Sequence, residues 1–182
     1  MFHYQNIHLI DLYSEALHIP VVKSHTAGTK EEEVEDLKNA IEDIEAEGIV
    51  SGAISSYYQK SRIDRICREL GLRSLTPLWH KNELELLRDV LKNQLDVIIT
   101  GVYAHGFNEE WLGKRIDEET VDKLIGLNRK HGISLVGEGG EYETLVLDAP
   151  FFEKRIKIVA ANRIWEKQSG YYKVTTAELR EK

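Results

Sequence analysis

The feature that most constrains the fold is the most continuous β-branched run of the chain, at residues 96–102, which reads Asp-Val-Ile-Ile-Thr-Gly-Val. It is rich in β-branched residues and lacks polar alternation, so it predicts a central strand buried on both faces. Shorter runs of the same kind lie at residues 49–54 and 72–76, and helical patterns separate the three. This alternation predicts an α/β fold built from βαβ units around a mainly parallel sheet.

Several amphipathic helices carry recognisable end signals. Asn82 and Asp117 are predicted N-caps, and Thr29 with Glu32 forms a potential capping box. Glycines following the apolar stripes predict the helix ends. The predicted helices lie at residues 5–18, between Thr29 and Gly48, before Gly71, after Asn82, and between Asp117 and Gly132.

Further short strands complete the predicted sheet. Residues 19–22 and 133–136 are each apolar and short enough to be strands. After Pro150 the pattern changes, because residues 155–159 and 171–175 alternate or run apolar on either side of Gly170. These last two segments predict a C-terminal antiparallel strand pair, and we divide the chain at residue 150.

The composition bounds the class of protein. The chain has 182 residues, of which 42% are hydrophobic and 30% charged, as expected of a globular protein with a real core. No apolar run reaches the ~20 residues of a membrane helix, and no signal peptide is recognisable, so we expect no membrane association and a cytoplasmic location. The net charge of −7 argues against general nucleic-acid binding. Cys67, the single cysteine, lies on a helical apolar stripe, which favours a core thiol in a reducing compartment.

The segments that follow the predicted strands hold most of the unusual residues. In parallel sheets, ligands bind beyond the carboxyl ends of the strands. Glycines, tryptophans, loop tyrosines and clustered glutamates gather in these segments, so we expect them to form one site. The segments are residues 52–59, 77–80, 101–111 and 137–144.

The first candidate element is a strand-to-helix turn that could hold an anion. Small residues at a strand end open toward a helix N-terminus, and a downstream arginine can pair with a phosphate. The alternative is an ordinary turn with solvated cations. The candidate nucleotide-binding residues are Gly52, Ala53, Ser56, Tyr58, Gln59 and Arg62, together with Gly101 at the end of the central strand.

The second candidate element is the segment Gly-Glu-Gly-Gly-Glu-Tyr-Glu-Thr at residues 137–144. Its carboxylates, Glu138, Glu141 and Glu143, repel one another unless a cation or a raised pKa offsets the repulsion. They suit a cation, an amine or general-base catalysis better than a phosphate, which would need Mg²⁺ between. An exposed acidic turn before the next strand is the alternative.

Two tryptophans lie in loops predicted at the same sheet edge. Trp79 and Trp111 could stack on a base or cover a pocket, although packing caps are at least as common. The seven histidines show no metal-ligand spacing, so no resident metal is expected.

Four segments together resemble the diphthine–ammonia ligase family of the ATP-pyrophosphatase group, over nearly the whole chain. They are residues 52–62, 76–79 and 111–115 and the glutamate-glycine segment at 138–144. The resemblance implies a Rossmann-like fold of the adenine-nucleotide hydrolase type, with helices on both faces of the sheet. Residues 1–150 would then be a nucleotide-binding domain, and residues 151–182 would form part of the substrate side.

The resemblance also implies an activity. It is the ATP-dependent amidation of diphthine to diphthamide on translation elongation factor two, with Mg²⁺ and with ammonium as nitrogen donor. The diphthine carboxylate would be adenylated and ammonia would then displace AMP. Glu138, Glu141 and Glu143 would bind the cationic substrate or deprotonate ammonium. Trp79, Trp111, Gly139, Gly140, Tyr142 and Thr144 would complete the substrate side.

The sequence departs from the family pattern at its start. Family members carry a Ser-Gly-Gly-Lys-Asp-Ser phosphate loop in a first βα unit, and this sequence contains no such loop. We therefore expect the first βα unit to be missing. Two alternatives stay open on this ground: a non-catalytic adenine-nucleotide-binding module, or a truncated remnant that folds as a homodimer.

Overall fold

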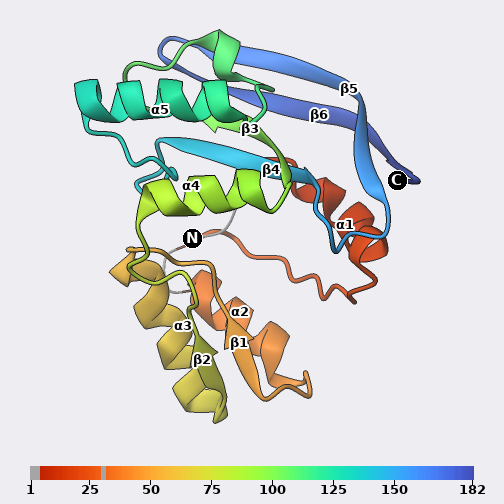
Figure 1. Ribbon diagram of the computed structural model, residues 1–182. Coiled ribbons are helices and arrows are strands. Elements are labelled where there is room, and N and C mark those ends of the chain that lie inside the picture. The colour runs from red at the N-terminus through yellow and green to blue at the C-terminus, as the bar shows by residue number, and fades with distance from the viewer. Residues whose placement is uncertain (1–4, 30–31) are drawn as a thin grey trace. The chain divides into compact units, whose positions relative to one another are not determined.

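A computed structural model describes residues 5–29 and 32–182 (Figure 1). The described residues form two compact units. The first contains residues 21–29 and 32–81, and the second contains residues 5–20 and 82–182. The chain thus divides at Lys81, and the C-terminal strands belong to the same unit as the central strand. None of the helices within the described ranges has the length and apolar character needed to cross a membrane.

The first unit is a single βαβ arrangement with one extra helix. Strands β1 (Gly48–Val50) and β2 (Arg73–Leu75) pair in parallel, as predicted, and α3 (Tyr57–Leu70) connects them. Helix α2 (Glu32–Glu42) contacts α3, where the Lys38 ammonium lies 2.8 Å from the Glu69 carboxylate. Ile66 and Cys67 of α3 are buried, so the prediction of a core thiol is confirmed.

The predicted end of α2 at Gly48 is wrong. The helix ends at Glu42, and Gly48 instead opens β1. A Cβ atom at Gly48 would lie 2.6 Å from the carbonyl oxygen of Arg73, so the close approach of the two strands requires glycine there. The capping box predicted for Thr29 and Glu32 spans residues 30 and 31, which lie outside the described residues.

The second unit is built on a four-stranded sheet in the order β4-β3-β6-β5. Its strands are β3 (Asp96–Val102), β4 (Tyr142–Asp148), β5 (Arg155–Glu166) and β6 (Ser169–Arg180). The C-terminal antiparallel pair is confirmed, and so is the burial of β3. The expected parallel pairing is wrong for this sheet, because β3 runs antiparallel to both β4 and β6.

Helices cover both faces of this sheet, as predicted. Helices α4 (Glu83–Lys92) and α5 (Glu118–His131) contribute to a core that contains Val97 and Ile99 of β3. Helix α1 (Ile10–Leu17) packs on a second core around Ile98, whose side chain points to the opposite face. The predicted caps of α4 and α5 are confirmed, since Asn82 and Asp117 accept hydrogen bonds from the amides of Glu85 and Thr120.

Residues 5–20 belong to the second unit. A short 3₁₀ helix, η1 (Ile7–Leu9), leads into α1, which confirms the helix predicted at residues 5–18. The buried Asn6 side chain donates to the carbonyl of Tyr172 at 3.0 Å and accepts from the amide of Val174 at 2.9 Å. The strand predicted at residues 19–22 is wrong: the Ile19 amide bonds to the Ser14 carbonyl of the helix end, and Pro20 has no amide hydrogen to donate.

The sheet is incomplete between β3 and β6. These strands pair only at Gly101 and Val102. Further back along β3, residues 113–116 take the place of β6: the Gly113 amide donates to Ile99 and the Ile116 amide to Val97, both at 2.8 Å. The short helix η2 (Glu109–Trp111) precedes that segment.

Candidate functional site

Two of the four predicted site segments meet in the first unit. The His80 amide donates to the carbonyl of Ile54 at 2.8 Å. The ring of Trp79 contacts the exposed Tyr57 edge-on at 5.1 Å between centroids and His80 at 4.6 Å. The structure therefore joins residues 52–59 to residues 77–80 through an aromatic cluster at the start of α3.

The predicted nucleotide-binding residues of this unit lie around the same helix start. The Ser56 hydroxyl caps α3 by accepting from the Gln59 amide at 3.3 Å. The Arg62 guanidinium lies 3.5 Å from the centre of the Tyr58 ring and donates to the Tyr58 carbonyl. Ala53 is buried, whereas Gly52 is exposed. A helix start and a guanidinium can bind a phosphate, and aromatic rings can contact an adenine, so these residues are compatible with an adenine nucleotide.

The other two predicted segments meet in the second unit. Gly101 pairs with Glu143 and Val102 with Tyr142 in the β3–β4 ladder. The Tyr103 amide donates to the Glu141 carbonyl at 2.8 Å. Each pair of segments is thus brought together within its own unit. The single site predicted from all four segments stays a prediction.

The predicted strand at residues 133–136 is wrong, because two carboxylates hold this segment as a loop. Glu83, in the first turn of α4, accepts from the Ser134 hydroxyl at 2.9 Å and the Leu135 amide at 2.7 Å. Glu141 accepts from the amides of Ser134 and Gly139, each at 2.9 Å. These acceptors replace the carbonyls that a neighbouring strand would offer.

Ser134 and Glu83 are residues that the sequence did not single out. The Ser134 hydroxyl also accepts from the amides of Val136 at 3.2 Å and Glu138 at 3.1 Å. Ser134 therefore orders the start of the glutamate-glycine loop. The signal for Glu83 was ambiguous, since an acidic residue in a first helical turn is common for electrostatic reasons alone.

The three predicted catalytic glutamates have different surroundings. Both carboxylate oxygens of Glu141 hold the loop, as described above. Glu138 is half-buried near the loop start. Glu143 lies on β4 and lines a cavity of about 140 Å³, whose other lining residues include Tyr13, Thr100 and Thr144.

Glu143 also interacts with Tyr103. Tyr103 is 41% exposed. The partial burial of its ring raises the pKa of the phenol to about 12, and the charge and hydrogen bonding of Glu143 add to that shift. A phenol that keeps its proton is a hydrogen-bond donor to a carboxylate. Of the three glutamates, Glu143 is thus the one that lines this cavity and also interacts with the Tyr103 hydroxyl.

The predicted substrate-binding residues separate into buried and exposed groups. Trp111 is 8% exposed and packs edge-on against Phe107 in the core. Tyr142 is buried, and its hydroxyl donates to the carbonyl of Leu135. Gly139, Gly140 and Thr144 are exposed. Their roles in substrate binding stay predictions.

The described part of the chain contains no group of three or more His, Cys, Asp or Glu side chains arranged to hold a metal ion. In nucleotide-binding sites, Mg²⁺ is commonly held by the nucleotide phosphates and water, with few protein ligands. A metal delivered with a nucleotide is therefore compatible with this arrangement.

Two family models match the chain. The diphthamide synthase N-terminal domain matches residues 1–74, and the diphthamide synthase C-terminal domain matches residues 82–179. The short interval between the two matches contains the unit boundary at Lys81.

The curated relatives described here are all named diphthine–ammonia ligase. The diphthine–ammonia ligase of Schizosaccharomyces pombe is 38% identical over 187 residues, which cover 93% of this chain and 30% of that protein. The Homo sapiens protein of the same name is 38% identical over 171 residues, covering 84% and 64%. The Mus musculus protein is 34% identical over 194 residues, covering 97% and 72%. The chain thus spans less than two thirds of the first two relatives.

Proposed function

The chain belongs to the diphthamide synthase family, and from this premise we propose that it is a ligase that amidates diphthine with ATP and ammonium. The protein substrate would be translation elongation factor two carrying diphthine. The proposal rests on the family and on one structural observation: Glu143 lines a cavity and interacts with the Tyr103 hydroxyl.

The nucleotide would bind at the start of α3. The aromatic cluster of Tyr57 and Trp79 offers ring edges and faces to an adenine, and Arg62 offers a charged donor to a phosphate. When bound, ATP would supply the adenylyl group that activates the diphthine carboxylate, with pyrophosphate as the leaving group. Mg²⁺ would accompany the phosphates.

Glu143 would act on the nitrogen donor. Its carboxylate can bind ammonium by a charge-assisted hydrogen bond and accept one of its protons. The resulting ammonia nitrogen would form the amide bond to the diphthine carbonyl carbon as the bond to AMP breaks. Tyr103 would hold the Glu143 carboxylate in place as a positioning residue, since it donates to that carboxylate.

The separation of roles among the glutamates makes this proposal specific. Glu141 would hold the loop in place and would not contact the substrate, because both of its carboxylate oxygens accept hydrogen bonds from backbone amides. Glu143 lies on a strand of the sheet, where a functional group is held more firmly than in a loop.

The test is amide formation on diphthine-bearing elongation factor two, followed by mass spectrometry together with AMP release. We expect Glu143→Gln to lower kcat by about 100-fold or more, because a general base contributes typically 10²–10⁴-fold. Glu166→Gln, at the exposed end of β5, is the matched control and should leave the rate unchanged.

Two outcomes would contradict the proposal. One is the absence of AMP release by the wild-type chain under these conditions. The other is a Glu143→Gln variant as active as the wild type. Calorimetry with AMP distinguishes the two alternative functions. Tight binding of AMP without turnover would identify a non-catalytic nucleotide-binding module, and no binding would identify a truncated remnant.

A further inference from the structure

The second unit contains a hollow that the proposed reaction does not use. It opens where β3 and β6 diverge, since these strands pair only at Gly101 and Val102. Its volume is about 410 Å³. Apolar side chains of every strand of the sheet contribute to its lining: Ile98, Leu147, Ile156, Ile158 and Tyr172. We call it the basic hollow, for the reason given next.

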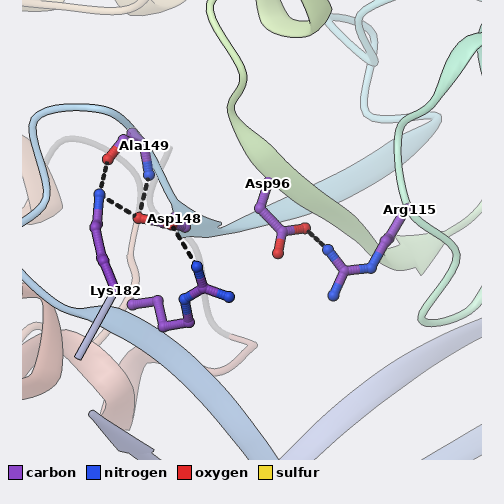
Figure 2. A network of polar contacts seen from close by, with 6 residues as sticks. Asp96, Arg115, Asp148, Ala149 and Lys182 are labelled. Atoms are coloured by element: carbon purple, nitrogen blue, oxygen red, sulfur yellow. Dashed lines mark hydrogen bonds and ion pairs between the residues drawn. The ribbon is translucent and has the colours of Figure 1, made fainter. Parts of the chain in front are cut away.

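The charged groups at the basic hollow are mostly cations. Arg115, Arg155 and Lys157 line it, with Asp96 as the acidic member of the lining. Figure 2 shows the ion pairs of this region: Arg115 binds Asp96, and Lys182 binds Asp148 at 2.7 Å. The Arg155 guanidinium lies 4.0 Å from Asp148. Three cations and one carboxylate thus line the hollow, and the adjoining Lys182–Asp148 pair adds no net charge, in a chain whose net charge is −7.

The cations keep donors available for a ligand. The side chains of Arg115 and Arg155 are 62% and 54% exposed, although each has a carboxylate partner. No carboxylate of the described residues lies within ion-pair distance of Lys157. Glu178, opposite Lys157 in the β5–β6 ladder, is bound by Arg180 at 2.8 Å.

We propose that the basic hollow is a second binding site, for a phosphomonoester with a small apolar body. Two positive charges in excess suit a dianion, and guanidinium groups donate to phosphate oxygens in a matching fork geometry. The half-buried Ile158 and Tyr172 would contact the apolar body, as is usual in sites that combine an apolar wall with a few polar groups. This site is independent of Glu143 and of the α3 start.

Phenyl phosphate is the probe, with inorganic phosphate and phenol as its two halves. Binding to the full chain is followed by amide chemical shifts. We expect shifts at Ile98, Ile156 and Tyr172, and weaker binding as the salt concentration rises. Lys157→Ala and Arg155→Ala should each weaken binding about tenfold or more, because each removes a charge-assisted hydrogen bond to the phosphate.

Lys173→Ala is the matched control, because Lys173 is an exposed cation of β6 that does not line the hollow. It should bind phenyl phosphate like the wild type. An unchanged unfolding temperature of Lys157→Ala would show that the variant is folded.

Three results would overturn the proposal. Equal binding by wild type, Lys157→Ala and Arg155→Ala would mean an adventitious ion only. Inorganic phosphate binding as tightly as phenyl phosphate would remove the role of the apolar lining. Shifts confined to residues 52–62 would place the probe at the proposed nucleotide site instead.

Discussion

At the scale of single residues, the glutamate-glycine loop is held by acceptors that its own sequence supplies. The Glu141 carboxylate accepts hydrogen bonds from two backbone amides, and the Ser134 hydroxyl accepts hydrogen bonds from two more. Removing an acceptor leaves a half-buried amide unpaired, and such a loss costs about 1–3 kcal/mol. The clustered glutamates therefore do not all require a bound cation to explain their presence.

Replacement of Glu141 should separate a structural role from a catalytic one. We expect Glu141→Ala to lower the free energy of unfolding by about 1–3 kcal/mol, and Glu141→Gln to lower it less, since one amide oxygen remains as acceptor. Urea denaturation measures both. Glu110→Ala, at an exposed position of η2, is the control. A Glu141→Ala variant as stable as the control would contradict this role.

Two glycines of the same loop offer a second test. Gly137 and Gly140 have φ angles of 70° and 81°, so alanine is strained at both. At Gly137 a Cβ atom would also lie 2.5 Å from the Tyr142 carbonyl oxygen, whereas at Gly140 it would meet no atom within 4 Å. We expect Gly140→Ala to cost about 1 kcal/mol of stability and Gly137→Ala clearly more. Equal losses in urea denaturation would count against the close contact.

At the scale of elements, the sequence predicted most helices and the strands that they connect. Caps at Asn82 and Asp117 are local signals, and so is the β-branched run of β3. The antiparallel pairing of β3 was not predictable, because the residues of a strand do not determine which strand it pairs with or in which direction. Residues 133–136 were mistaken for a strand because the carboxylate that holds them, Glu83, is distant in sequence.

The same limits apply to the candidate site. The sequence singled out Glu143 and the start of α3 from residue type and position, and their roles stay predictions. It could not show that Trp111 and Tyr142 are buried, because side chains at a predicted sheet edge pack inward or outward according to contacts made elsewhere in the chain.

The contact between α3 and β2 has a predictable pH dependence. The hydrogen bond from Lys60 at 2.6 Å, followed by one from Ser74 at 2.6 Å, holds the pKa of Asp64 below its ordinary value of 3.8. Because the folded-state pKa of Asp64 is lowered, the ionised carboxylate stabilises the folded state at pH values above its ordinary pKa. This stabilisation is lost as the pH falls through the folded-state pKa.

Asp64→Asn should therefore destabilise the protein at about pH 6 and much less at about pH 3. The difference in unfolding free energy between variant and wild type, measured by urea denaturation at both pH values, checks this. Asp89→Asn, on the exposed side of α4, is the control. A difference that stays constant with pH would contradict the assignment.

At the scale of the whole molecule, the second unit is built from two stretches that are separated in the sequence. Residues 5–20 belong to the second unit, although the sequence of the first unit lies between them and Asn82. Ala16 of α1 is fully buried beside Ile98, Leu147 and Ile156. The Glu153 amide also donates to the Ala16 carbonyl at 2.7 Å. The core of the second unit is thus incomplete without the first helix.

A fragment that begins at Asn82 should accordingly fail to fold cooperatively, because it exposes the apolar side chains that α1 covers. Joining residues 5–20 to Asn82 through a Gly-Ser linker should restore a cooperative transition. Circular dichroism during urea denaturation measures both fragments. Equal transitions in the two would show that α1 contributes little.

The two hydrogen bonds of Asn6 join positions that are 166 and 168 residues apart in the chain. During synthesis on the ribosome, the segment around Asn6 emerges well before Tyr172 and Val174, so it must wait for these partners to be made. Until then the apolar side of α1 stays uncovered and is a target for chaperones. Contacts of such high sequence separation also slow folding, so the completion of this core should be the late step in the maturation of the nascent chain.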